Sequence, residues 1–251
     1  MSPVTPIGLQ LYSVRHAMDL DAPGTLARVA NLGFDGVEMA GLHGLQPGEF
    51  RSLLDDLGLM LVSAMVGLSP DGLSGETLEF AAAVGAPWLV VNAWEADFAS
   101  IDSISRLAAS FNRAVEQAAA IGVELGYHNH FWEFSASGAG AAPMAEFVSR
   151  MDGGFLELDV YWLSAACTDW PAALAPIADR VRTVHVKDGP GTLPTADWQV
   201  QPMTPAGTGT VDLVGMLAAL PRAEWHVVEF DECAGDVFEA IAASRRFLLG
   251  G

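Results

Sequence analysis

The sequence predicts a (β/α)8 barrel, in which eight parallel strands alternate with eight helices and close on themselves. A unit recurs in the first half of the chain: a helix-like segment ends in glycine, and a short apolar strand follows at once. Short apolar runs that helices separate indicate a parallel sheet covered by helices. Eight such units in 251 residues match the usual size of this barrel.

The predicted elements follow in chain order. The first strand is expected in IGLQLYS, residues 7–13. The next four strands each follow a glycine at a helix end, where we expect the left-handed conformation that strains other residues: Gly33, Gly58, Gly85 and Gly122. The last three strands are expected within residues 153–162, 179–189 and 224–232, each after an amphipathic or alanine-rich stretch.

A doubly wound open sheet is the rival fold. Against it, neither a G-x-G-x-x-G motif nor a Walker loop follows an early strand. No linker, low-complexity run or block of charge divides the chain, so we expect one domain over residues 1–251. The last helix, within 237–251, ends in apolar residues, which fits either a helix that closes the barrel wall or contact with a second subunit in a homo-oligomer.

The charge of the chain is strongly acidic, with 31 Asp and Glu against 12 Lys and Arg and a formal net charge of −19. A field of this sign repels phosphate backbones and anionic lipids, so we expect no nucleic acid or membrane partner. No apolar run reaches the roughly 18–20 residues of a membrane span, and the start of the chain lacks the pattern of a signal peptide. Cys167 and Cys233 are too far apart to predict a disulfide framework. We therefore expect a cytoplasmic protein.

Polar residues are concentrated where the predicted strands end. Because side chains alternate along a strand, one parity faces the barrel interior. That parity includes the following residues: Gln10, Tyr12, Glu38, His128, His130, Glu157, Asp159, Thr183, His185, Lys187, Glu229 and Asp231. Most lie near the carboxyl end of their strand, the face where barrel enzymes build their sites. Burying several carboxylates and imidazoles together is costly unless a cation or solvent compensates them.

A divalent metal would compensate these groups most simply. Asp159, His185 and Glu229 end strands six, seven and eight, and each could donate one ligand. Mixed carboxylate and imidazole ligands suit Mn²⁺, Co²⁺, Zn²⁺ or Fe²⁺ better than calcium. The alternative is a set of structural residues bonded to one another, because buried polar groups normally have partners.

Several stretches carry a family resemblance: QLYSVR, GFDGVEMAGLHG, GYHNHFWEF, LELDVYW, VHVKDG, GTGTVD and VVEFDE. Together they resemble the xylose-isomerase-like TIM-barrel family of sugar phosphate isomerases and epimerases. Relatives in that family include inosose dehydratases, ketose 3-epimerases, hydroxypyruvate isomerases and endonuclease IV. The resemblance runs over nearly the whole chain, and it identifies the superfamily better than the substrate.

The resemblance implies a divalent cation at the barrel mouth, held by one residue from each of strands five to eight; Mn²⁺ is expected first, with Co²⁺, Zn²⁺, Fe²⁺ or Mg²⁺ as alternatives. Asp159, His185 and Glu229 carry over directly. The strand-five ligand departs from the commonest pattern, glutamate followed by asparagine, since His128 precedes Asn129 here. Either His128 is the ligand, or Glu133 folds back from the loop to supply a carboxylate.

The implied reaction is isomerisation or epimerisation of a sugar, keto-sugar or cyclitol through a metal-stabilised enediolate. His128, His130 and Glu133 are candidate bases. Lys187, the only lysine in the chain, is a candidate acid or oxyanion partner.

The other expected substrate contacts are Gln10, Tyr12 and Glu38 for sugar hydroxyls and Trp162 as an apolar wall. AGTGTVD, residues 206–212, is a weak signal for a phosphate site before a helix. With so few cations nearby, we expect an unphosphorylated substrate.

Two departures from the family pattern keep other functions open. Met65 stands where relatives often carry histidine, and Trp162 stands where ketose epimerases place histidine. The second departure weakens the assignment as an epimerase. Together with the Y-H-N-H form of residues 127–130, it keeps a lyase as the nearest alternative, either an inosose-dehydratase-like enzyme or one that eliminates from a 3-keto-glycoside. A non-catalytic binding barrel is the alternative from another class. Endonuclease activity would need a cluster of lysine and arginine, which this chain lacks.

Overall fold

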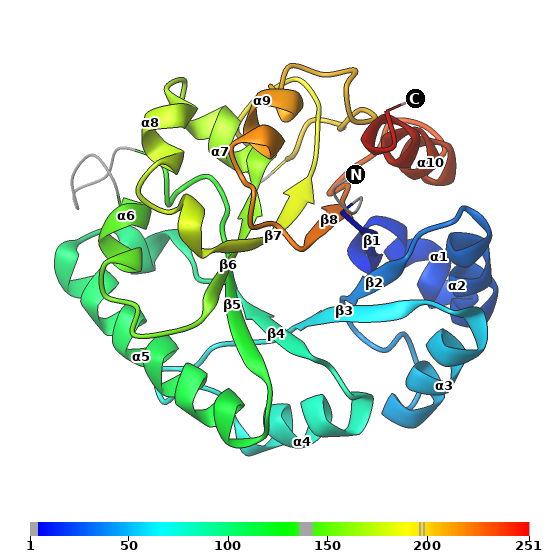
Figure 1. Cartoon of the computed structure of the whole chain (residues 1–251), viewed down its shortest axis with the longest axis horizontal. Helices are drawn as coiled ribbons and strands as arrows, with labels where there is room; N and C mark the ends of the chain where they lie inside the picture. Colours follow the sequence, from blue (N-terminus) through cyan, green and yellow to red (C-terminus); the bar gives the residue numbers. More distant parts are fainter. Residues whose placement is uncertain (1–4, 136–142, 196, 198, 251) are drawn as a thin grey trace.

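The computed structural model describes residues 5–135, 143–195, 197 and 199–250. Residues 1–4, part of the segment for which no signal peptide is expected, lie outside the described residues. Eight parallel strands pair in chain order and close into a barrel. Figure 1 shows them at the centre with the helices around them. The strands are β1 (Ile7–Gln10), β2 (Gly36–Met39), β3 (Met60–Met65), β4 (Trp88–Val91), β5 (Glu124–His128), β6 (Phe155–Asp159), β7 (Val181–Val186) and β8 (Trp225–Val228). This arrangement confirms the predicted (β/α)8 barrel.

The described residues form more helices than the eight predicted. The α-helices are α1 (Arg15–Leu20), α2 (Ala22–Asn31), α3 (Pro47–Leu57), α4 (Gly75–Val84), α5 (Ile101–Ala120), α6 (Pro143–Val148), α7 (Val160–Ala166), α8 (Trp170–Leu174), α9 (Leu213–Ala218) and α10 (Val237–Leu248). Three 3-10 helices add to them: η1 (Leu11–Val14), η2 (Glu95–Phe98) and η3 (Ala178–Arg180).

The extra helices arise from one local motif. Asp21 accepts a hydrogen bond from the N–H of Gly24 at the start of α2, and Asp169 does the same for Ala172 at the start of α8. In both cases a proline follows two residues after the aspartate. An N-cap aspartate with proline in the first turn starts a helix. The predicted helices after β1 and β6 are therefore divided in two.

The glycines predicted at helix ends have the expected conformation, since Gly33, Gly58, Gly85 and Gly122 all have positive φ. The strands are shorter than predicted, however. Tyr12 lies in η1, and the strand expected to reach residue 162 stops at Asp159, whose side chain caps α7. Lys187 and Glu229 each lie one residue beyond the end of their strand.

The barrel interior is apolar at the amino ends of the strands. Trp88, Phe155 and Trp225 are the first residues of β4, β6 and β8, and they pack with Val62, Val90 and Val227. In barrels of this kind, side chains from alternate strands form the layers that fill the interior. Gly126 on β5 makes this possible, because a Cβ there would lie 2.5 Å from the Phe155 ring.

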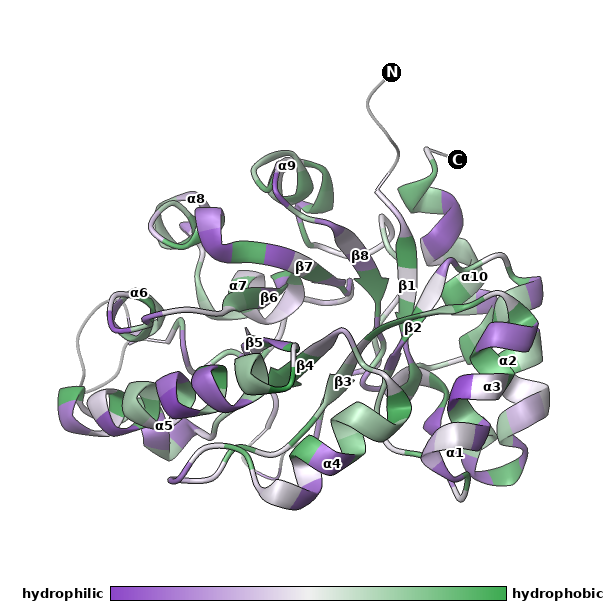
Figure 2. Cartoon of the chain, turned by 60° about the horizontal axis from the view of Figure 1, so that its bottom comes forward, coloured by the Kyte–Doolittle hydropathy of each residue, from purple (hydrophilic) through white to green (hydrophobic). Residues whose placement is uncertain are grey.

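A second, larger core lies between the strands and the surrounding helices. Figure 2 shows apolar strands at the centre and helices with one apolar and one polar side around them. Helix α10 contacts β1 and β8, so it covers the barrel wall. Among the described residues, no helix combines the length and the hydropathy needed to cross a membrane.

Candidate metal centre

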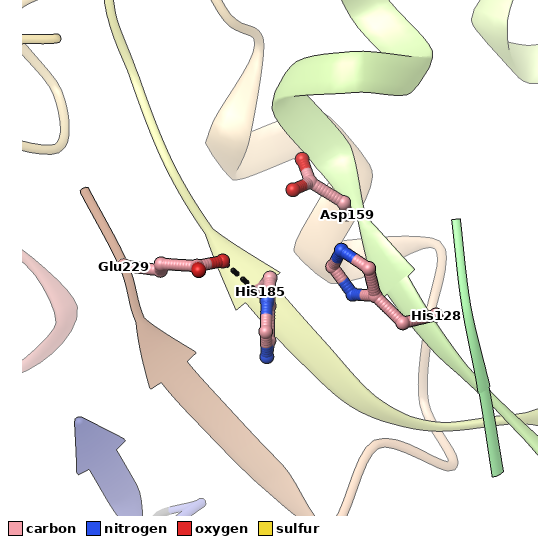
Figure 3. A group of neighbouring side chains, drawn as sticks. All are labelled: His128, Asp159, His185 and Glu229. Atoms are coloured by element: carbon pink, nitrogen blue, oxygen red, sulfur yellow. Dashed lines mark ion pairs between the residues drawn. The ribbon is translucent and has the colours of Figure 1, made fainter. Parts of the chain in front are cut away.

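Four side chains converge at the carboxyl ends of β5 to β8: His128, Asp159, His185 and Glu229 (Figure 3). Each offers one ligand atom, and these atoms all lie within 4.8 Å of one another. Strand register brings them together, since Asp159 pairs directly with His185 across β6 and β7. All four residues are buried. We call this set the four-residue group.

The donor atoms of this group fit a divalent cation. Asp159 Oδ2, His185 Nδ1 and Glu229 Oε2 are buried and make no hydrogen bond of regular geometry within the parts of the chain that the structure describes. They do make close charged contacts, for example 2.6 Å between His185 Nδ1 and Glu229 Oε2. Two carboxylates and two imidazoles are a ligand set that Mn²⁺, Fe²⁺, Co²⁺ and Zn²⁺ accept.

The four-residue group lies beside a pocket of about 270 Å³. The residues that line it are Gln10, Tyr12, Ala40, Met65, Asn92, His128, His130, His185, Lys187, Glu229 and Asp231. Of the candidate substrate contacts, Gln10 and Tyr12 therefore reach the pocket. Glu38 and Trp162 are not among the lining residues.

Glu38 is fully buried, and its carboxylate is already bonded. It accepts hydrogen bonds from Gln10 and Ser63, and its Oε1 lies 2.8 Å from His185 Nε2. Burial, followed by the nearby carboxylate of Glu157, raises the pKa of Glu38 to about 7. Trp162 is buried behind Lys187, whose Nζ lies 5.8 Å from the centre of its ring.

Lys187 is a buried cation in contact with three carboxylates of the site. Its Nζ lies 2.9 Å from Asp159 Oδ2, 2.7 Å from Glu229 Oε2 and 3.0 Å from Asp231 Oδ2. Burial alone would lower the pKa of Lys187, but Asp159, Asp231 and Glu229 together raise it well above its usual value. Lys187 is therefore charged at neutral pH.

The two histidines of the HNH stretch have different surroundings. Burial, and then the charge of His185, lowers the pKa of His128 to about 4, so its ring is uncharged and can donate a lone pair to a metal. Burial and His128 lower the pKa of His130 well below its usual value. The His130 ring stacks on Trp132, with centroids 4.4 Å apart and planes at 13°.

Glu133 does not join the four-residue group. Its Oε1 accepts a hydrogen bond of 2.8 Å from the Tyr127 hydroxyl, and its Oε2 accepts one of 3.0 Å from the His130 N–H. Tyr127 has the outward parity on β5, so these bonds hold Glu133 outside the barrel mouth. His128 is thus the strand-five residue whose donor atom lies with Asp159, His185 and Glu229.

Glu133 makes stability depend on pH. Burial raises its pKa from 4.5 to about 8, so the folded protein binds this proton more tightly than the unfolded chain. Its contribution is fully present below about pH 4.5 and is lost as pH rises towards about 8, by on the order of a few kcal/mol. Glu133→Gln mimics the neutral acid, and we expect it to remove this loss.

Urea unfolding at about pH 5 and about pH 9 measures the effect directly. The variant should gain stability relative to the wild type as pH rises. Glu79→Gln, at an exposed position on α4, is the matched control. Equal pH profiles for the wild type and Glu133→Gln would show that Glu133 is charged in the fold.

The backbone N–H groups of the GTGT loop already bind a side chain of the protein. The buried Asp188 carboxylate accepts hydrogen bonds from the N–H groups of Gly207 and Gly209, both at 2.9 Å, and of Val211 at 3.1 Å. These donors are the ones that a phosphate would need. Asp212 caps α9 by accepting from the N–H of Gly215.

Two asparagines complete the site, although the sequence did not single them out. Asn129 bridges the ends of β5 and β6: its Oδ1 accepts from the Asp159 N–H at 2.9 Å, and its Nδ2 donates to the Asp159 backbone carbonyl oxygen at 3.3 Å. Asn92 lines the pocket just beyond β4. The parity rule, extended past the end of β4, would have found Asn92.

Comparison with known proteins agrees with this architecture. Residues 26–248 match the family model described as xylose isomerase-like TIM barrel. No protein with a curated description matches the sequence. Among solved structures, a sugar phosphate isomerase/epimerase from Parabacteroides distasonis is similar, with a TM-score of 0.81, 20% identity, and 98% of this chain and 94% of that chain covered.

Two further solved structures represent different reactions. A D-allulose 3-epimerase from Methylomonas sp. has a TM-score of 0.68 and 17% identity, with 99% of this chain and 98% of that chain covered. A probable 3-DHS dehydratase, AsbF from Bacillus anthracis, has a TM-score of 0.73 and 15% identity, with 97% and 98% covered. At these identities the likeness establishes the fold.

Proposed function

The chain belongs to the xylose isomerase-like TIM barrel family, and we propose that it is a divalent-metal-dependent isomerase or epimerase acting on a sugar, a keto-sugar or a cyclitol. The observation that carries this proposal is the four-residue group beside a pocket that a small polyol could enter. His128, Asp159, His185 and Glu229 would hold the ion, for which Mn²⁺ is our first choice. A bound ion would act as a Lewis acid on the carbonyl and hydroxyl oxygens of the substrate.

The remaining pocket residues supply an acid and a base. His130 is uncharged and lines the pocket, so its ring can accept a proton from the carbon next to the carbonyl. Lys187 is charged and can donate a hydrogen bond to the oxygen on which negative charge develops. A positioned base typically contributes about 10²- to 10⁴-fold to the rate.

The same pair of groups also suits dehydration, which is the second candidate. The His130 ring is uncharged, and the Lys187 ammonium carries a proton. His130 would remove the proton, and Lys187 would protonate the departing hydroxyl as water. The similar solved structures include both an epimerase and a probable dehydratase, so they do not separate these outcomes.

The charges around the pocket favour a substrate without phosphate. Among the residues that line it, Lys187 is the only lysine or arginine, and three carboxylates already surround its Nζ. The backbone N–H groups of the GTGT loop bind Asp188. A phosphate would therefore meet more negative charge than positive charge here.

Proton exchange tests this proposal. The protein loaded with Mn²⁺ is incubated in D2O with keto-sugars, aldoses and inososes, and the products are followed by NMR and mass spectrometry. We expect deuterium at the carbon next to the carbonyl, together with an isomer or epimer. Loss of water from the substrate would instead support the dehydratase. No exchange in any of the three classes, with metal bound, would contradict both.

A further inference from the structure

One buried carboxylate contacts both histidines of the four-residue group. Oε1 of Glu157 lies 3.0 Å from Nε2 of His185 and 3.3 Å from Nδ1 of His128. Glu157, His128 and His185 are all buried, with Glu157 fully so. This oxygen accepts no regular hydrogen bond from the described part of the chain, so it is free to accept one from either ring.

The position of Glu157 follows from strand order. It lies on β6, between β5, which carries His128, and β7, which carries His185. Its backbone pairs with His128 on one side and with Thr183 on the other. The register of β6 against β7 shifts between Leu156 and Glu157, and such irregularities re-aim side chains near active sites. The Thr183 hydroxyl then holds Oε2 of Glu157 at 3.1 Å.

These contacts decide which ring nitrogens face the metal position. An imidazole has two nitrogens, and the one that donates to a carboxylate is not available to a metal. Glu157 shares Nε2 of His185 with Glu38, whose Oε1 is the closer oxygen at 2.8 Å, and Nδ1 of His185 faces Glu229 at 2.6 Å. Glu157 takes Nδ1 of His128, which leaves Nε2 as that ring's remaining nitrogen. Among the ion pairs of the described residues, Glu38 contacts Nε2 of His185 but does not contact His128.

We propose that Glu157 is a positioning residue that orients both imidazole ligands of the metal centre at once. This inference rests on the proposed function, because it needs a metal to bind the four-residue group. Carboxylates that accept the second N–H of a metal-bound histidine fix the ring and raise its basicity. Here a single carboxylate would couple the two rings, so its loss would disturb two of the four ligands together.

The test compares Glu157→Gln with the wild type in binding of Mn²⁺, measured by calorimetry, and in the visible absorption spectrum of the Co²⁺ form. The glutamine keeps an oxygen at the position that faces both rings, but this oxygen is neutral, so it accepts from them more weakly than a carboxylate and raises the basicity of neither ring. We expect Mn²⁺ affinity to fall about 10- to 100-fold, and the Co²⁺ spectrum to change. Glu124→Gln, at the exposed start of β5, is the matched control and should leave both unchanged.

A second variant covers the case in which Glu157→Gln fails to fold. Thr183→Val keeps the carboxylate but removes the hydroxyl that holds it, and we expect a smaller fall in affinity with a changed Co²⁺ spectrum. Wild-type affinity and an unchanged spectrum in the folded variants would overturn the role of Glu157 while leaving the metal centre intact. A wild-type protein that binds neither ion would overturn the metal centre, and this inference with it.

Discussion

Asp159→Asn is expected to weaken Mn²⁺ binding by at least about 100-fold, more than the loss of a residue that only supports a ligand. The substitution keeps the shape of the side chain but removes its negative charge. The amide has one oxygen and one NH2 group in place of the two carboxylate oxygens. The remaining oxygen can still accept the Trp162 N–H, which Asp159 Oδ1 does at 3.0 Å, so α7 should still begin at Val160. The fold should survive, and the metal affinity should not.

Asp169→Asn provides a closely matched control for this experiment. Asp169 also caps a helix, α8, by accepting from the N–H of Ala172, but it does not belong to the four-residue group. Titration calorimetry with Mn²⁺ compares the two variants under the same conditions. If Asp159→Asn bound Mn²⁺ as tightly as Asp169→Asn does, Asp159 would not be a ligand.

Lys187→Met is expected to cause the largest loss of stability in the metal-free protein. The ammonium lies within 3.0 Å of carboxylates from Asp159, Glu229 and Asp231. Removing one partner of a buried ion pair leaves uncompensated charge and typically costs about 3–5 kcal/mol. Added Mn²⁺ should restore part of this loss, by about 2.7 kcal/mol at 100 times its Kd, because it supplies positive charge to two of the same carboxylates.

Arg222→Met separates this effect from the loss of any ion pair. Arg222 pairs with Asp179 at 3.5 Å, but both side chains are exposed, at 66% and 90%. Exposed pairs contribute about 0–1 kcal/mol. Urea unfolding of both variants, with and without Mn²⁺, measures the difference. A loss in Lys187→Met no larger than in Arg222→Met would show that the carboxylates around Lys187 are neutral or hydrated.

The sequence was sufficient to predict the barrel, because its evidence is repeated along the chain. Each strand is a short apolar run, and four of them follow a glycine whose positive φ the structure confirms. The parity rule also predicted that Glu157, Asp159 and His185 face the barrel interior, since side chains alternate regularly along the strands of a barrel. The divided helices could have been predicted as well, because Asp21 and Asp169 each precede a proline by two residues.

The roles of individual polar residues were harder to predict, because they depend on contacts between distant segments. Parity directs Glu38 inward, but only the folded structure shows that Gln10, Ser63 and His185 already occupy its carboxylate. Glu133 was open as a ligand or a base, and its bonds to Tyr127 and His130 hold it outside the four-residue group. In the GTGT loop, the sequence could not show that Asp188 turns back to bind the backbone donors.

Metal content per chain is the most direct test of the central claim, that His128, Asp159, His185 and Glu229 bind one divalent ion. The protein is purified without chelator, loaded with Mn²⁺, freed of excess ion by gel filtration and analysed by elemental mass spectrometry beside Asp159→Asn. We expect close to one ion per chain in the wild type and close to none in the variant. A wild-type protein that retains no Mn²⁺, Fe²⁺, Co²⁺ or Zn²⁺ after loading would contradict the metal centre and the chemistry proposed for it.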